Sequence, residues 1–276
     1  MRFFRCVLLL IAAASLAACA SVHSRGARHA GSIVDFLYPN ANTAPVLAPT
    51  VTELRLPVRV GIAFVPGSQR GMAPSEQERQ QMLERVKGAF SAHAYIGKIE
   101  VIPTAYLRAG GGFDNLDQVA RMFDVDVVAL LSYDQVRFHD TNRLAVLYWT
   151  IAGAYVIKGN QYDVQTLLDA AVFDVKSRKL LFRAPGTSQV KGAASLAAFS
   201  EEARAAQSRG YHDALALLIP QLQAELGNFR ERVKSNPQQF KVAKEPGYRG
   251  GGDAGWLAAL AALATLFLTH ARRRGH

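Results

Sequence analysis

The stretch VDVVALLSY, residues 125–133, is apolar at almost every position and is followed by the polar sequence DQVRFHD. A strand with one face in solvent alternates apolar and polar residues, whereas a strand covered on both faces is apolar throughout. The stretch therefore predicts a strand at the centre of a sheet, with other elements packed on both of its faces.

Two more strands are predicted before this one. Residues 58–66, VRVGIAFVP, first alternate and then run apolar, which is typical of a buried strand, and residues 98–102 predict a second strand. A helix is predicted between them, because Ser75 and Glu78 form a capping box. Its apolar face consists of Met82, Val86, Ala89 and Phe90.

A second helix is predicted after residue 102, with Asp114 as its N-cap. Its apolar face consists of Leu116, Val119, Ala120 and Phe123. Strands and helices thus follow one another in the order β-α-β-α-β. This order predicts an α/β fold with a mixed sheet, and α+β is the alternative class.

A β-hairpin is predicted later in the chain. Residues 164–175 alternate, residues 176–178 form a turn, and residues 179–183 return. The phrase AAVFDVKSRKLLFRAPG resembles a hairpin with the pattern D-x-x-T-G-x-x-L in the lipoprotein domain of curli-secretion and related envelope proteins, with Arg178 in place of the glycine. Residues 144–157 are also apolar, and they predict either a bent pair of buried strands or a core helix.

A long C-terminal helix is predicted over residues 193–233, with a break near Gly210. One stripe of this helix is apolar and contains Leu215, Leu218, Leu222, Leu226, Phe229 and Val233. The stripe is interpreted as core packing, and a self-association face is the alternative.

The first residues have the three regions of a signal peptide. Arg2 and Arg5 form the basic region, residues 7–14 the apolar region, and residues 15–18 the small-residue approach to a cleavage site. The last four positions before and at the cleavage point, Leu16-Ala17-Ala18-Cys19, resemble the lipobox of bacterial lipoproteins.

The lipobox resemblance implies cleavage between Ala18 and Cys19 by the lipoprotein signal peptidase, a diacylglycerol on the Cys19 thiol, and acylation of the new amino group. Ala20 replaces the aspartate of an inner-membrane retention signal, so the outer membrane is the expected destination. Cys6 leaves with the signal peptide, so the mature chain would hold neither a disulfide nor a free thiolate.

The other end of the chain carries a second apolar segment. Residues 254–269 are uncharged and would reach roughly 24 Å as a helix, which is short of the hydrocarbon core of a bilayer. Interfacial Trp256 and the cluster Arg272, Arg273 and Arg274 would help it to span, with the arginines in the cytoplasm. A C-terminal helix packed on the domain is the alternative.

Three glycines precede this segment. The order of Gly250, Gly251 and Gly252, an apolar helix and an arginine cluster resembles the GlyGly-CTERM sorting signal, whose processing enzyme is rhombosortase, a rhomboid-type intramembrane serine protease. With the lipobox and the phrase SIVDFLYP at residues 32–39, the chain resembles the rhombotarget lipoprotein family. The resemblance implies a temporary C-terminal anchor, cut near the glycines, where each glycine weakens a helix by about 1 kcal/mol.

Neither a catalytic motif nor a metal motif is found. His93 and His212 lie on predicted helices and are interpreted as structural, and residues 110–112, GGG, lack the Lys-Ser/Thr of a P-loop and are interpreted as a hinge. Asp124 and Asp126 flank the start of a strand and are interpreted as solvated acids rather than an acid/base pair. The formal net charge of +10 comes without a dense basic stripe interleaved with aromatic residues, which argues against a nucleic-acid partner.

Five regions are thus expected: a lipoprotein signal peptide (1–18), a lipidated tether (19–56), a globular α/β domain (57–233), a polar linker with the glycine-rich cleavage region (234–252) and a transmembrane sorting tail (253–276). The expected protein is a non-enzymatic lipoprotein of the outer membrane or cell surface, and its core domain is expected to be a binding or structural module. Its expected partners are membrane lipid, the lipoprotein signal peptidase and the rhomboid-type protease, and its only bound group is the covalent lipid on Cys19.

Two other functions stay open at this point. The first is a periplasmic assembly or secretion accessory that forms a homo-oligomer through the stripe at 215–233 and keeps its C-terminal helix. The second is an envelope hydrolase with a dispersed catalytic site.

Overall fold

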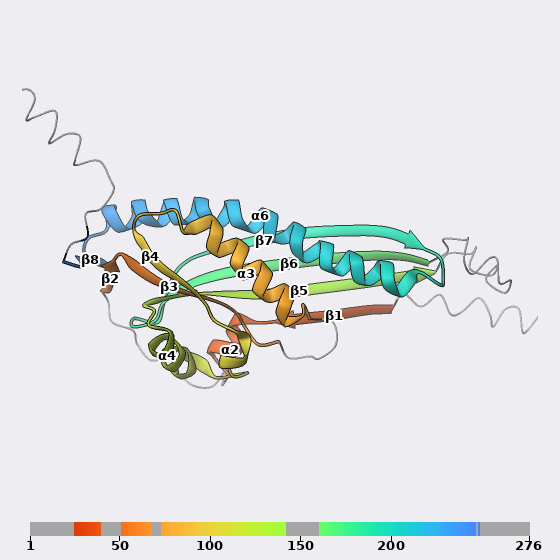
Figure 1. The fold of residues 1–276 in the computed structure, drawn as a ribbon, viewed down its shortest axis with the longest axis horizontal. Coiled ribbons are helices and arrows are strands. Elements are labelled where there is room, and N and C mark those ends of the chain that lie inside the picture. Colours follow the sequence, from red (N-terminus) through yellow and green to blue (C-terminus); the bar gives the residue numbers. More distant parts are fainter. Residues whose placement is uncertain (1–24, 40–50, 68–72, 142–159, 247, 249–276) are drawn as a thin grey trace, which may run out of the picture.

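The computed structural model describes residues 25–39, 51–67, 73–141, 160–246 and 248, and these residues form a six-stranded mixed sheet with helices on both faces and a separate two-stranded sheet (Figure 1). The strands are β1 (Arg25–Gly31), β2 (Thr52–Leu56), β3 (Val58–Phe64), β4 (Ile96–Val101), β5 (Val127–Thr141), β6 (Asn160–Asp174), β7 (Lys179–Ala194) and β8 (Phe240–Lys244). The helices are α2 (Ile33–Leu37), α3 (Glu76–Phe90), the 3-10 turn η1 (Thr104–Tyr106), α4 (Gly112–Phe123) and α6 (Phe199–Ser235). The α/β prediction is confirmed.

The sheet is organised around β5. Its strand order is β4-β3-β5-β6-β7, and β1 also pairs with β5. β3 runs parallel to the first part of β5, from the pair Val60 and Val127 onward, whereas β1 runs antiparallel to its later part, with Arg25 opposite His139. β6 and β7 continue the sheet as the predicted hairpin, and Arg178 in its turn has a positive φ of 57°, the conformation that usually favours glycine.

β5 is covered on both faces, as the opening stretch predicts. Leu131 is fully buried in a cluster with α3 and α6, and Leu130 is fully buried in a second cluster with α2 and α4. Figure 1 shows the same arrangement, with α3 and α6 on one side of the sheet and α2 and α4 on the other. Two separate apolar layers therefore meet at this one strand.

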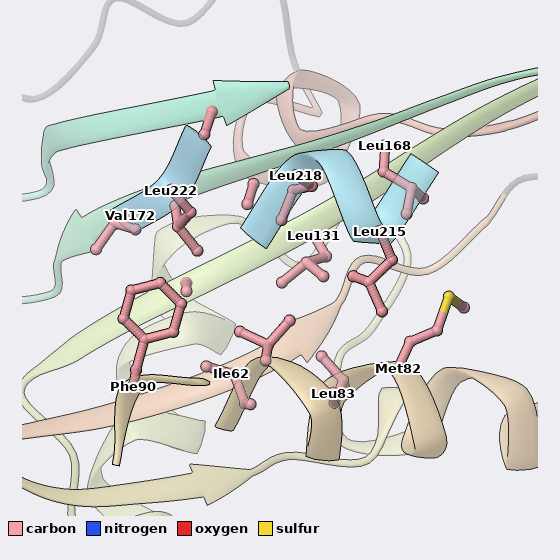
Figure 2. Close-up of a cluster of buried hydrophobic side chains, with 14 of the residues drawn as sticks. Ile62, Met82, Leu83, Phe90, Leu131, Leu168, Val172, Leu215, Leu218 and Leu222 are labelled. Carbon is pink, nitrogen blue, oxygen red and sulfur yellow. The ribbon is translucent and has the colours of Figure 1, made fainter. Parts of the chain in front are cut away.

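The apolar stripe of α6 lies in the core. Leu215, Leu218, Leu222 and Phe229 are at most 6% exposed, and Figure 2 shows Leu215, Leu218 and Leu222 pointing toward the sheet and α3. Leu226 and Val233 are partly buried against the same cluster. The stripe is therefore not available as a self-association face, and that alternative is wrong.

Local geometry differs from two of the expected boundaries. α6 runs without a break through Gly210. The glycine instead lets the helix approach the sheet closely, since a Cβ there would lie 2.5 Å from Thr166 Oγ1. α4 begins at Gly112 after a turn in which Gly110 and Gly112 have positive φ, so Asp114 lies in the first helical turn and is not the N-cap. The Ser75–Glu78 capping box of α3 is confirmed.

The folded domain extends beyond 57–233 at both ends. β1 and α2 belong to it, with Phe36 and Leu37 of α2 buried, so much of the expected tether over 19–56 is in fact part of the fold. β2 pairs in parallel with β8, from Thr52 opposite Phe240 to Leu56 opposite Lys244. The expected tether and linker boundaries are thus wrong, because segments from both regions satisfy each other's backbone hydrogen bonds.

The signal peptide, Cys19, residues 144–157 and the C-terminal tail from residue 249 lie outside the described residues. Within the described ranges, none of the helices is both long and apolar enough to cross a bilayer.

Replacing Leu218 with aspartate tests the core assignment of the stripe. We expect the free energy of unfolding to fall by at least about 3 kcal/mol, because an unpaired carboxylate would replace a fully buried side chain. The measurement is urea unfolding of the detergent-solubilised full chain, followed by circular dichroism. Leu217→Asp is the control, since Leu217 is 57% exposed on the same helix and its replacement should cost less than about 1 kcal/mol. Equal losses in both variants would contradict the assignment.

Candidate functional site: an apolar pocket beneath the end of α6

An apolar pocket of about 360 Å³ lies between the sheet and the helices α3 and α6, near the C-terminal ends of both helices. Ligand pockets in proteins usually measure roughly 300–1,000 Å³ and are lined mainly by apolar side chains. The pocket therefore has the size and the lining of a site for a small apolar molecule.

The floor of the pocket is one row of residues across the sheet. Ala129 of β5 lies opposite Ile62 of β3 on one side and opposite Val172 of β6 on the other, and all three line the pocket. Because the side chain of Ala129 is only a methyl group, it leaves space above the sheet between the larger side chains of Ile62 and Val172. A single small residue on the central strand thus contributes to the depth of the pocket.

The walls come from the two helices. Val86 and Phe90 of α3 line one side, and Leu222, Leu226 and Phe229 of α6 line the other. Figure 2 shows Phe90 and Leu222 at one end of the buried cluster, while Met82, Leu83 and Leu215 occupy the other end. The layer between the helices and the sheet is therefore filled around Met82, Leu83 and Leu215 and hollow beside Phe90 and Leu222.

The small sheet of β2 and β8 completes the pocket. Leu54 and Leu56 of β2 and Val242 of β8 are among its lining residues, and Tyr248 lines it beyond β8. The sequence analysis missed this part, because it assigned β2 to a tether and β8 to a linker. The alternation in TELRL at 52–56 and FKVAK at 240–244 is a signal that could have found both strands.

The charged residues that line the pocket are all basic: Lys87, Arg230, Lys234 and Lys244. Lys87 and Lys234 form ion pairs with the glutamates three residues before them, at 3.9 and 2.8 Å. Within the described part of the chain, Arg230 and Lys244 form no ion pair with a carboxylate. The rim of the pocket therefore carries unbalanced positive charge.

Tyr95 lies beside this charge. The guanidinium carbon of Arg230 is 4.8 Å from the centre of the Tyr95 ring, a cation-π contact. Burial raises the pKa of the Tyr95 phenol, and Arg230 opposes that rise, so the phenol is neutral at physiological pH. Arg230 is thus held against an uncharged ring rather than against an acid.

A second hollow, of about 560 Å³, lies near the N-terminal ends of α3 and α6 and has a different character. Its lining includes Glu78, Arg137 and Arg204, so charges of both signs are present. Tyr211 also lines it, and its buried hydroxyl has no hydrogen-bond partner among the described residues. Burial is the main cause that raises the pKa of this phenol, with Tyr133 and nearby carboxylates adding to it.

The residues predicted from the sequence to carry sorting, namely Ala18, Cys19, Gly250, Gly251, Gly252, Trp256, Arg272, Arg273 and Arg274, all lie outside the described residues. The structure therefore brings none of them to the pocket. The pocket itself was not predicted, because its lining comes from elements distributed from residue 54 to residue 248.

The two aspartates at the start of β5 have a structural role. Asp126 accepts two hydrogen bonds from Arg59, at 2.8 and 2.7 Å, and Asp124 pairs with the same guanidinium. Asp124 also ends α4 in a left-handed conformation, with φ of 54°. These contacts raise the pKa of Arg59, so the two acids, interpreted from the sequence as solvated, are in fact paired with a guanidinium.

The two singled-out histidines also make structural contacts. His93 stacks on Tyr95 with ring centres 5.1 Å apart, and Nδ1 of His212 lies 3.3 Å from a guanidinium nitrogen of Arg85. Within the described ranges, His, Cys, Asp and Glu side chains nowhere form a group of three or more that could hold a metal ion.

Comparisons with known proteins give only a remote likeness. No protein-family model matches the chain, and no curated protein matches it. A neuraminyllactose-binding hemagglutinin homolog from Helicobacter pylori is 9% identical with a TM-score of 0.39, and the match covers 72% of this chain and 98% of that one. Two structures of the PelC dodecamer from Paraburkholderia phytofirmans are 10% identical with TM-scores of 0.30 and 0.26, covering 72% of this chain and 96% of theirs. Similarity at this level identifies neither a ligand nor a partner.

Proposed function

We propose that this chain is an exported lipoprotein, anchored by a lipid on Cys19, and that its core is a non-catalytic binding module that takes an apolar ligand into the pocket beneath α6. The lipobox at 16–19 and the signal peptide before it support the anchor. The pocket supports the binding role.

One observation carries the binding role: an apolar hollow between the sheet and the C-terminal ends of α3 and α6. A protein interior is normally packed as densely as an organic crystal, and unfilled apolar volume loses dispersion contacts. Beside the pocket the same layer is filled by fully buried Met82, Leu215 and Leu218. A ligand that fills the hollow end would restore the missing contacts.

Filling the pocket with protein atoms tests this role. Ala129→Phe on the floor and Leu226→Trp on the wall should each reduce labelling of the pocket by a photoactivatable hydrocarbon probe by about tenfold, because the added ring would occupy the ligand volume. The measurement is mass spectrometry of labelled peptides from the full-length protein in its own membranes.

Leu217→Trp is the matched control for these variants, since it adds the same ring to an exposed position of α6. Circular dichroism checks that each variant is folded. The binding role would be wrong if folded filling variants were labelled as strongly as the parent chain.

We propose further that the C-terminal segment is a temporary anchor that a rhomboid-type protease removes near Gly250, Gly251 and Gly252, after which the lipid holds the protein at the outer membrane or cell surface. Glycine disfavours a helix by about 1 kcal/mol per residue relative to alanine, so we expect this backbone to be accessible to the protease. Two lipid signals already give stable attachment, so the acyl chains on Cys19 would make the C-terminal segment redundant as an anchor.

The mass of the C-terminal peptide tests the sorting proposal. We expect mature protein from its native host to end within or beside Gly250–Gly252, and host cells that lack the protease to keep His276. Replacing the three glycines with alanine should slow the cleavage, because it extends the helix. Recovery of the peptide through His276 as the dominant surface species would overturn the proposal.

Replacing Cys19 with serine tests the lipid anchor. The variant should incorporate no radioactive palmitate, and it should be extracted without detergent once the C-terminal segment is also removed, because no acyl chain would hold it. The parent chain carrying the same C-terminal truncation is the control and should require detergent. Palmitate on the Cys19→Ser chain would contradict a lipid at this position.

A further inference from the structure

We propose that the ligand of the apolar pocket is an anionic amphiphile with a single hydrocarbon chain, whose acidic group is bound at the rim by Arg230 and Lys244. The proposal rests on the binding role proposed above and specifies its chemical class. Its basis is the charge distribution around the pocket.

The sign of the rim charge selects an anion. Among the described lining residues, four are cations and no acid is present; Lys87 and Lys234 are paired with glutamates outside the lining, which leaves Arg230 and Lys244 unbalanced. Their side chains reach the surface while the floor at Ile62 and Ala129 is buried, so a bound molecule would meet apolar walls inside and positive charge at the mouth. A carboxylate, sulfate or phosphate at the end of an apolar chain matches both parts.

The cations are arranged to act together. Arg230 reaches the rim from α6, where Lys234, one turn later on the same face, is already paired with Glu231. Lys244 reaches the same rim from β8. The stack on Tyr95 restrains the Arg230 guanidinium before any ligand binds, which lowers the entropy cost of binding.

The available volume favours one chain. At about 360 Å³ the pocket is at the lower end of the usual range for ligand sites, so a single hydrocarbon chain fits better than the two chains of a phospholipid.

The apolar C-terminal segment of the same chain is a poorer occupant. An α-helix with side chains is roughly 10–12 Å across, and residues 254–269 are followed by Arg272, Arg273 and Arg274, which would add positive charge beside a rim that is already positive. The segment is connected to the pocket through Tyr248, so its occupancy is included as an outcome of the test.

The test compares three photoactivatable probes with the same twelve-carbon chain (about the length that a small pocket accepts) and different ends: a carboxylic acid, an alcohol and an amine. Membranes containing the full-length protein are labelled, and peptides from β5 and α6 are quantified by mass spectrometry. Labelling of an unrelated membrane protein in the same sample corrects for differences in partitioning.

We expect the acid to label the pocket about tenfold more than the alcohol, and the amine to label it least, because the rim attracts the first and repels the last. Arg230→Gln and Lys244→Gln should each reduce the ratio of acid to alcohol, whereas Arg230→Lys should retain most of it. Lys241→Gln is the matched control, since Lys241 is on β8 but does not line the pocket, and it should leave the ratio unchanged.

Three other outcomes would each contradict a different part of the proposal. Equal labelling by all three probes, reduced by Ala129→Phe, would leave the binding role intact and overturn the anionic ligand. If none of the three probes labelled the parent chain more strongly than the Ala129→Phe variant, the binding role itself would be wrong. Labelling that appears only when the chain is ended before Gly250 would identify the C-terminal segment as the occupant and overturn the proposal.

Discussion

The requirement that β5 be buried on both faces organises this protein. Consecutive residues of the strand, Leu130 and Leu131, belong to two different apolar clusters, so neither helical layer can be removed without exposing the central strand. β3 and β1 share one edge of β5 end to end, and β6 occupies the other. Because β5 is longer than β3, the sheet extends well beyond the α/β unit, and α6 covers that extension.

The position of α6 decides where the apolar layer is filled. Gly210 allows the helix to approach Thr166 of β6, and Gly186 of β7 allows a similar approach, since a Cβ there would lie 2.8 Å from the backbone nitrogen of Leu218. These contacts fix the first half of α6 close to the strands. Toward its C-terminal end the helix has no comparable glycine contact among the described residues, and there the space above Ala129 stays open. The pocket is thus a consequence of how closely the two halves of α6 pack on the sheet.

Local patterns in the sequence predicted the elements that depend on local physics. The apolar run at 125–133, the capping box at Ser75 and the hairpin turn before Lys179 each produced a correct element. Elements that depend on distant partners were not predicted: β2 and β8 are five residues each and pair across almost two hundred positions, so their short alternation alone did not show that they belong to the fold. The pocket could not be predicted for the same reason, since Ala129 contributes to its depth only when it lies between Ile62 and Val172 in the sheet.

The two ends of the described domain leave it at opposite ends of the sheet. Arg25 lies opposite His139, while β3 begins its pairing with β5 at Val127, so the N-terminal exit and the pocket end are separated by roughly 40 Å along β5 at about 3.3 Å per residue. On the proposed topology only five residues lie between Tyr248 and residue 254, so at most about 22 Å of chain separates them. Before processing, the mouth of the pocket would be held near the membrane, where an anionic amphiphile is concentrated. After processing, only the far end would be anchored, and the pocket could move away from that surface with its ligand.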